Sequence, residues 1–249
     1  MSAPAWLIER PIAHRGLHDA RRGLIENTLG AAEAAIGAHC AIECDVQLSR
    51  DGEAMVFHDD NLRRLAHAGG ALSARSLAEL RRVALRGSDE GIPTLPELLA
   101  RIAGRTPLIC ELKSCFDGDM SLADRVAAIA KTYSGPLALK SFDPAFIAHL
   151  RQRGDLVAPL GVVAQADYSG WHWRAMSAEQ KRDHAAFAHI SQTRPDFLSW
   201  SVDDLPHPTP MLLRALSGLP VMVWTVRTPA QRRRAAQFAD QIIFEGAPH

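Results

Sequence analysis

The sequence predicts an α/β fold, a single (β/α)8 barrel or TIM barrel with a hairpin and a small insertion after the second strand. Short β-prone runs alternate with Ala-, Leu- and Arg-rich stretches of helical period along the whole chain, which is the pattern of a parallel sheet with helical crossovers. Eight such runs in 249 residues also match the usual size of one barrel. No repeat, linker or charge block divides the chain, so we expect one domain over residues 1–249.

The strands and helices are expected in strict alternation. The eight strands are Ile12–Arg15, Ile42–Val46, Leu108–Lys113, Leu137–Ser141, Ala158–Ala164, Phe197–Trp200, Val221–Val226 and Ile242–Phe244. The helices between them are Thr28–Ile36, Leu95–Arg101, Leu122–Lys131, Ala145–Gln152, Ala178–Ile190, Pro210–Leu216 and Ala230–Phe238. Asn27 is the expected N-cap of the first helix, and Thr228 comes shortly before the last.

A further β-prone run, Ala54–His58, does not fit the parallel pattern. Only residues 47–53 separate it from the second strand, whereas a parallel crossover needs about a dozen residues or more. Asp51-Gly52 is a strong hairpin signal, so we expect residues 46–57 to fold back as an antiparallel excursion. This excursion returns His58 toward the end of the second strand. Residues from about 61 to 91 then form a small insertion before the next helix.

The composition excludes several classes of protein. A 47% hydrophobic content excludes disorder, and 28 basic against 28 acidic residues remove the general phosphate attraction of nucleic-acid binders. No run of eighteen apolar residues exists, and residues 1–10 lack a secretory signal, so we expect a cytoplasmic protein without a membrane span. The spacing of the four cysteines fits neither a disulfide scaffold nor a zinc site and predicts reduced, structural thiols at Cys40, Cys44, Cys110 and Cys115.

Carboxylates recur on one face of two neighbouring barrel strands. Glu43 and Asp45 alternate along the second strand and therefore share a face, and Glu111 and Lys113 do the same on the next barrel strand. Like charges this close either hold a cation or lie in water at a strand end, and the second pair could also be an ordinary ion pair. Three carboxylates without alternating His or Cys favour one hard cation, Mg²⁺ or Ca²⁺, over zinc.

Two histidines stand where strands end. His14, followed by Arg15 and Gly16, closes the first strand, and His58 closes the hairpin. Single histidines are often structural, but catalytic groups of such barrels gather at the carboxyl ends of the strands, which favours a catalytic role for both. Arg15 offers a fork of donors suited to phosphate, and Lys113 offers a point charge. A local anion site is therefore expected in a protein of zero net charge.

An ordered series of short motifs runs along nearly the whole chain. They are Ala13-His14-Arg15-Gly16, Glu26-Asn27-Thr28, Glu43-Cys44-Asp45-Val46, Asp51-Gly52, His58-Asp59, Pro93-Thr94-Leu95, Glu111-Leu112-Lys113, Ser141-Phe142-Asp143 and Trp224-Thr225-Val226. In this order they resemble the glycerophosphodiester phosphodiesterase family. The resemblance implies a (β/α)8 barrel that binds one divalent cation and exchanges protons with a phosphodiester. The implied metal ligands are Glu43, Asp45 and Glu111, and the implied proton-exchanging residues are His14 and His58.

The same resemblance implies how the substrate is held and where this chain departs from its relatives. Residues like Arg15 and Lys113 would bind the phosphate, and Trp224 would form part of the substrate wall unless it is only a core residue. Many relatives have Asp where this chain has Glu245, and Asn where it has Arg227, which puts substrate preference in doubt.

The function implied is metal-dependent hydrolysis of a glycerophosphodiester to an alcohol and glycerol 3-phosphate, with two histidines as acid and base. One alternative is a lysophospholipase D-like activity on lysolipids, which would need an apolar groove. The segment Trp171-His172-Trp173 is the only candidate for such a lip, and it could equally be a packed loop. The other alternative is a barrel that binds phosphorylated polyols without catalysis. The oligomeric state, the order of the two histidines and the attacking group, water or a substrate hydroxyl, stay open.

Overall fold

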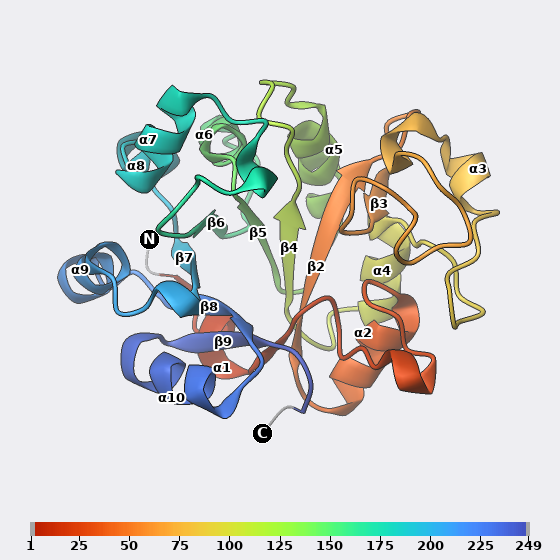
Figure 1. Cartoon of the computed structure of the whole chain (residues 1–249), viewed down its shortest axis with the longest axis horizontal. Helices are drawn as coiled ribbons and strands as arrows, with labels where there is room; N and C mark the ends of the chain where they lie inside the picture. Colours follow the sequence, from red (N-terminus) through yellow and green to blue (C-terminus); the bar gives the residue numbers. More distant parts are fainter. Residues whose placement is uncertain (1–2, 248–249) are drawn as a thin grey trace.

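The computed structural model describes residues 3–247, which form a closed barrel of eight parallel strands (Figure 1). The strands are β1 (Ile12–Ala13), β2 (Ala41–Leu48), β4 (Leu108–Leu112), β5 (Leu137–Ser141), β6 (Leu160–Ala164), β7 (Phe197–Ser201), β8 (Val221–Val226) and β9 (Gln241–Phe244). They pair in chain order, and the pairing of β9 with β1 closes the ring. The predicted fold class is therefore confirmed.

The remaining strand, β3 (Ala54–Val56), forms the predicted hairpin. It is antiparallel to β2, with Val46 opposite Val56 and Leu48 opposite Ala54. The hairpin continues β2 beyond the level at which the other strands end. It thereby carries His58 back to the carboxyl end of the barrel.

Helices surround the barrel in Figure 1. They are α1 (Trp6–Glu9), α2 (Leu29–Gly37), α3 (Leu77–Leu80), α4 (Leu95–Ile102), α5 (Ser121–Ala130), α6 (Pro144–Gln152), α7 (Ala178–Ala185), α8 (Ile190–Thr193), α9 (Pro208–Ser217) and α10 (Pro229–Phe238). Short 3-10 turns are η1 (Ala20–Arg22), η2 (Leu72–Ala74), η3 (Trp171–Trp173) and η4 (Val202–Asp204). The short helices α1 and α3 were not predicted.

Two predictions about helix boundaries are wrong. The single helix expected over Ala178–Ile190 is broken, because Phe187 adopts a left-handed φ of 57° between α7 and α8 and buries its ring in the core. The N-cap of α2 is Thr28, whose hydroxyl accepts a hydrogen bond from the amide of Ala31, rather than Asn27. Asn27 has a φ of 60° and turns its side chain toward Asp45.

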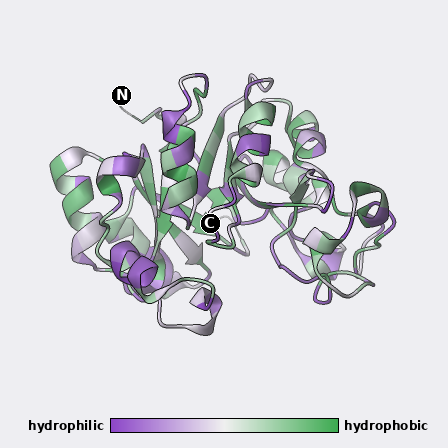
Figure 2. Ribbon diagram, turned by 90° about the horizontal axis from the view of Figure 1, so that it is seen from above, coloured by the Kyte–Doolittle hydropathy of each residue, from purple (hydrophilic) through white to green (hydrophobic). Residues whose placement is uncertain are grey.

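The inside of the barrel changes from apolar to charged along the strands. Its lower layer is an apolar cluster, closed from below by α1, that contains Leu7, Ile12, Ala41, Ile109, Ala138, Phe197, Met222 and Ile243. Side chains two residues further along a strand point the same way, so Glu43, Glu111 and Lys140 lie above Ala41, Ile109 and Ala138. Figure 2 shows the hydrophobic strands in green. Charged groups thus enter the interior only at its carboxyl end.

One glycine lets the lower layer close. A Cβ atom on Gly161 of β6 would lie 2.2 Å from the ring of Phe197 on the neighbouring strand β7. No side chain can stand there without displacing the ring. Gly161 therefore allows Phe197 to fill the barrel interior.

The segment after β3 packs around a small core of its own beside the barrel, at the right of Figures 1 and 2. Its buried apolar residues are Ile25, Met55, Phe57, Leu62, Ala66, Leu72, Leu80, Val83, Leu85 and Ile92. Phe57 belongs to this core and directly precedes His58. Packing of residues 61–91 therefore anchors the end of the hairpin.

No helix within residues 3–247 is both long enough and apolar enough to cross a bilayer. The four cysteines are free thiols, of which Cys115 is exposed and the other three are buried. Cys44 and Cys110 face each other across β2 and β4, on the side of the barrel wall that packs against the helices.

Candidate active site

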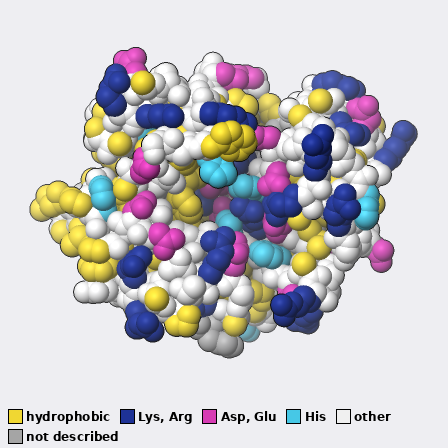
Figure 3. Space-filling model, in the orientation of Figure 1, with side chains coloured by type: hydrophobic (Ala, Val, Ile, Leu, Met, Phe, Trp, Pro, Cys, Tyr) yellow, Lys and Arg dark blue, Asp and Glu magenta, His cyan; other side chains and the backbone are white. Residues whose placement is uncertain are grey.

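A cavity of about 250 Å³ opens at the carboxyl ends of the strands. Its lining comprises His14, Arg15, Asp45, His58, Glu111, Lys113, Lys140, Phe142, Ser201, Asp203, Trp224, Thr225 and Arg227. Figure 3 shows charged and histidine side chains gathered around this hollow. Of the eight residues singled out from the sequence, seven line it, and Glu43 lies just beneath, 1% exposed. A larger cavity of about 680 Å³ between α4 and α5 contains none of them.

Three buried carboxylates from two neighbouring strands form the floor of the site. Glu43, Asp45 and Glu111 each place one oxygen within 4.8 Å of the others, and Asp45 is opposite Glu111 in the pairing of β2 with β4. Burial would raise the pKa of Asp45, but the positive charges of His58, Lys113 and other neighbours outweigh it and hold the pKa far below its usual value. An all-oxygen donor set fits a hard divalent cation.

Lys140 on β5 was missed by the sequence analysis. Its side chain is 2% exposed, and its Nζ lies 3.0 Å from Glu43 Oε1 and 3.2 Å from Glu111 Oε2. Burial alone would lower the pKa of Lys140, but the two carboxylates outweigh it and raise the pKa. The available sequence signal was a single charged residue, Lys140, directly after the apolar residues 137–139 of a predicted strand. In the structure the strand register places Lys140 directly opposite Glu111.

Replacing Lys140 with methionine is expected to cost the metal-free protein about 3–5 kcal/mol of unfolding free energy, because the buried carboxylates then lose their counter-charge. A divalent cation should restore part of this loss. Urea unfolding in EDTA and in excess Mg²⁺ measures both values. Lys131→Met is the matched control, since Lys131 forms only an exposed ion pair with Asp155. Equal losses for the two variants would contradict this role of Lys140.

His14 is held from behind by a carboxylate. Its Nδ1 lies 2.6 Å from Glu245 Oε1, and its Nε2 faces Glu43 Oε2 at 3.9 Å. Arg227 donates two hydrogen bonds to the same Glu245 carboxylate, from Nε to Oε2 at 2.7 Å and from Nη2 to Oε1 at 2.9 Å. Burial would raise the pKa of Glu245, but hydrogen bonds from His14 and Arg227 hold it well below the usual range. An ionised carboxylate accepts from Nδ1–H, which leaves Nε2 of His14 to face the site.

Glu245 and Arg227 are the two positions that the sequence analysis names as departures from the pattern implied by the resemblance. The sequence analysis assigned neither of them to the catalytic groups. In the structure they pair with each other at the ends of β8 and β9 and support His14. No local sequence pattern marks this pair, because Arg227 and Glu245 are 18 positions apart and Glu245 is 231 positions from His14.

His58 is held in the same manner at the end of the hairpin. Its Nδ1 lies 2.8 Å from Asp59 Oδ1, and Asp59 also accepts two hydrogen bonds from Arg64. Burial would raise the pKa of Asp59, but the hydrogen bonds from His58 and Arg64 dominate and lower it. Both histidines are thus oriented by a carboxylate at Nδ1, with the other ring nitrogen available.

Arg15 is fixed by a tight turn after β1. Arg15 and Gly16 have φ values of 57° and 80°, and a Cβ on Gly16 would lie 2.8 Å from the carbonyl carbon of Ala31. The turn aims the Arg15 amide at Glu43 Oε2, 3.2 Å away. Glycine is therefore required here, as the sequence indicates.

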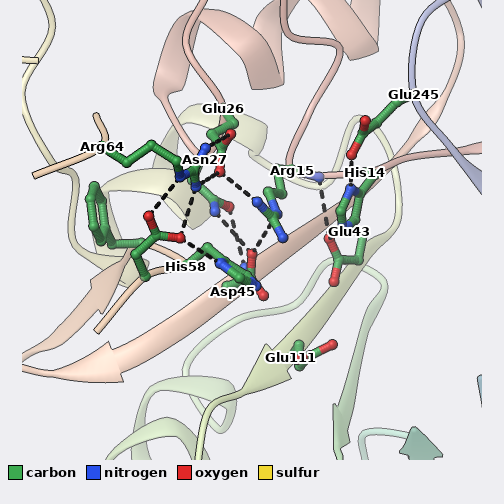
Figure 4. A network of polar contacts seen from close by, with 12 residues as sticks. His14, Arg15, Glu26, Asn27, Glu43, Asp45, His58, Arg64, Glu111 and Glu245 are labelled. Carbon is green, nitrogen blue, oxygen red and sulfur yellow. Dashed lines mark hydrogen bonds and ion pairs between the residues drawn. The ribbon is translucent and has the colours of Figure 1, made fainter. Parts of the chain in front are cut away.

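The Arg15 guanidinium lies among carboxylates (Figure 4). Its Nη1 donates to Glu26 Oε1 at 2.6 Å, and its Nε lies 3.1 Å from Asp45 Oδ2. Asn27 holds Asp45 from the other side, with Nδ2 donating to Oδ2 at 3.0 Å. Nη2 of Arg15 makes no hydrogen bond within residues 3–247 and is left for a ligand, and Lys113 adds a cation whose Nζ lies 3.1 Å from Glu111 Oε1. The Arg15 guanidinium, which was expected to bind phosphate with two donors, therefore already uses some of its donors on Glu26 and Asp45.

Aromatic side chains form the opposite, apolar wall. Trp224 is half-buried, its indole N–H donates to the carbonyl of Ser199 at 3.2 Å, and its ring meets Phe142 edge to face at 5.4 Å. Trp173 packs on Phe142 at a ring distance of 4.8 Å, whereas Trp171 is 70% exposed. Neither lines the cavity, so the segment 171–173 is a packed turn behind the wall with one outward tryptophan.

Known proteins are similar to this chain in sequence. The sequence model of the family described as "Glycerophosphoryl diester phosphodiesterase family" matches residues 14–244. YhdW of Bacillus subtilis (strain 168), provisionally described as a glycerophosphodiester phosphodiesterase, is 28% identical over 194 residues, covering 74% of this chain and 76% of that protein. A protein of Caldanaerobacter subterraneus subsp. tengcongensis named glycerophosphodiester phosphodiesterase is 34% identical over 112 residues, 41% of this chain and 44% of its own.

Solved structures show the same fold. A phosphodiesterase of Oleispira antarctica, in complex with the product sn-glycerol-3-phosphate, superposes with a TM-score of 0.77 at 24% identity over 96% of this chain and 93% of its own. The glycerophosphodiester phosphodiesterase of Thermotoga maritima gives a TM-score of 0.71 at 23% identity, covering 95% and 94% of the two chains. These likenesses support the barrel described above.

Proposed function

The chain belongs to the glycerophosphoryl diester phosphodiesterase family and is a phosphoric diester hydrolase, and from this premise we propose that it hydrolyses small glycerophosphodiesters to an alcohol and glycerol 3-phosphate by metal-dependent, two-histidine catalysis. One observation carries the proposal. His14 and His58 come from different strands, each is held at Nδ1 by a carboxylate, and both line one cavity with the carboxylate cluster.

Each group has a definite task in this proposal. Glu43, Asp45 and Glu111 would hold one divalent cation, Mg²⁺ or Ca²⁺. When bound, the cation would offset the negative charge of the phosphate and make the attacking oxygen more acidic. Nη2 of Arg15 and Nζ of Lys113 would bind the phosphate oxygens.

The histidines would move the protons. One histidine accepts the proton of the attacking hydroxyl at its Nε2, and the other donates a proton to the departing alkoxide. Trp224 and Phe142 would cover the apolar edge of the substrate and exclude water from that side. We also propose that residues 1–249 act as one domain, with residues 61–91 as an insertion that supports the site.

The cavity favours a small substrate over a lysolipid. Its volume is about 250 Å³, and Phe142 and Trp224 are its only large apolar lining residues. An acyl chain would need a long apolar groove, which the cavity does not offer.

A release assay tests the function. Glycerophosphocholine, glycerophosphoethanolamine and a lysophosphatidylcholine are each incubated with the enzyme, with and without EDTA. We expect metal-dependent release of glycerol 3-phosphate from the first two and little turnover of the lysolipid. Preferred turnover of the lysolipid would establish the alternative activity. Binding of glycerol 3-phosphate without turnover of any of the three would establish a non-catalytic barrel.

Replacing Arg15 with lysine is expected to raise KM for glycerophosphocholine by about tenfold or more, although the charge is kept. A lysine has one nitrogen, which cannot serve Glu26, Asp45 and the phosphate together. Steady-state kinetics at saturating metal measure this change. A variant with wild-type KM would remove Arg15 from the phosphate site.

A further inference from the structure

Arg64 lies in the insertion and joins two carboxylates of the site. Its Nε and Nη2 donate to Asp59 Oδ2 and Oδ1 at 2.6 and 2.8 Å. Its Nη1 and Nη2 donate to Glu26 Oε2 and Oε1, both at 2.8 Å. Arg64, whose side chain is 46% exposed, thus makes four charge-assisted hydrogen bonds through one guanidinium.

These two carboxylates orient the groups that face the substrate. Asp59 Oδ1 also holds Nδ1 of His58 at 2.8 Å, and Glu26 Oε1 also accepts from Nη1 of Arg15 at 2.6 Å. These contacts form a continuous path from His58 through Asp59, Arg64 and Glu26 to Arg15, and Figure 4 labels His58, Arg64, Glu26 and Arg15. Asp59 Oδ1 beside His58 and Glu26 Oε1 beside Arg15 are therefore both shared with Arg64.

Charge and shape both make an arginine necessary at this point. Glu26 and Asp59 are 11% and 23% exposed, so two partly buried negative charges would face each other without a cation between them. A planar guanidinium can pair with two carboxylates at once in a fixed geometry, whereas an ammonium is a single flexible point charge. Arg64 therefore fixes the orientation of both carboxylates and also compensates their negative charge.

We propose that Arg64 is a positioning residue that sets His58 and Arg15 in one common geometry, so that the proton-transferring and phosphate-binding groups are aligned together. This inference rests on the proposed function. It makes the insertion a structural part of the active site, since its apolar core holds the Arg64 backbone beside the hairpin end.

The test compares Arg64→Gln with Arg63→Gln. Arg63 is the adjacent residue, is exposed, and forms no ion pair among residues 3–247, so its variant makes the same charge change next to the site. We expect kcat/KM for glycerophosphocholine to fall by roughly 10- to 100-fold in Arg64→Gln, the usual effect of losing such a supporting partner, and to stay within about twofold in Arg63→Gln. Arg64→Lys should recover only a small part of the loss.

Kinetic constants separate positioning from a merely structural role. Asp59→Asn should mainly lower kcat through His58, Glu26→Gln should mainly raise KM through Arg15, and Arg64→Gln should do both. Added to the Asp59→Asn and Glu26→Gln double variant, Arg64→Gln should cost much less than it does alone, because the two charges that Arg64 pairs with are already neutralised. A purely structural role predicts a lower Tm with unchanged kcat and KM per folded molecule, and that result would overturn the inference.

If a variant is too unstable for kinetic measurements, NMR spectroscopy can test the inference instead. The ¹⁵N shifts of the His58 ring report whether Nδ1 carries the proton, and we expect this preference to weaken in Arg64→Lys and to persist in Arg63→Gln. An unchanged His58 ring in Arg64→Lys would also overturn the inference. Failure of the proposed function looks different, since the wild-type enzyme itself would then release no glycerol 3-phosphate.

Discussion

Replacing His58 with alanine is expected to lower kcat by about two to four orders of magnitude, and His14→Ala should have an effect of the same size. Each variant removes a proton acceptor or donor that a carboxylate holds in place at Nδ1. Steady-state kinetics at saturating metal and substrate measure the loss. Thermal unfolding of each variant shows whether it has kept its fold.

The double variant tests whether the two histidines serve one transition state. If they do, His14→Ala with His58→Ala should be little worse than the worse single variant. The wild-type rate should also pass through a maximum as pH rises, because one histidine must be protonated and the other neutral. Fully multiplicative losses, or a rate without a maximum, would assign the histidines to separate steps.

Removing divalent metal is expected to abolish turnover, and adding Mg²⁺ or Ca²⁺ should restore it. The reason is the cluster of three buried carboxylate oxygens within 4.8 Å of one another. The measurement is glycerol 3-phosphate release after dialysis against EDTA, followed by titration with each ion. Full activity in excess EDTA after that dialysis would falsify the metal role.

Asp45→Asn gives the same prediction at the level of one residue. It should weaken metal affinity, because a neutral amide replaces a charged ligand. Isothermal titration with Mg²⁺ or Ca²⁺ measures the affinity. Asp119→Asn is the control, since Asp119 is exposed and its carboxylate accepts hydrogen bonds from Ser121 alone within residues 3–247. Wild-type affinity in Asp45→Asn would exclude Asp45 as a ligand.

The strands and the carboxylate cluster could be predicted because both depend on local patterns. Alternation along two strands places Glu43, Asp45 and Glu111 on one face, and the Asp51-Gly52 turn returns His58 to that face. Each strand boundary falls within two residues of its predicted position. The alternation of side chains along the strands and the residues of the turn were sufficient to predict these features.

The supporting groups could not be predicted because they act across long sequence separations. His14 meets Glu245 from 231 positions away, and Arg64 meets Glu26 from 38 positions away. Nothing local marks such partners, since their roles depend on how distant loops pack. The break between α7 and α8 could not be predicted for the same reason. Phe187 buries its ring in the core with a left-handed backbone conformation, and this overrides the helical pattern of its neighbours.

The ammonium of Lys140 gives the carboxylate floor a permanent internal counter-charge. In small zinc domains the protein is unfolded until the ion arrives, because the ligands cannot be brought together alone. Here the chain supplies its own cation, so we expect assembly of the barrel not to wait for an ion. A newly made chain should then complete its tertiary structure in a metal-poor environment, and the supply of ions should set the share of molecules that are active rather than the share that fold.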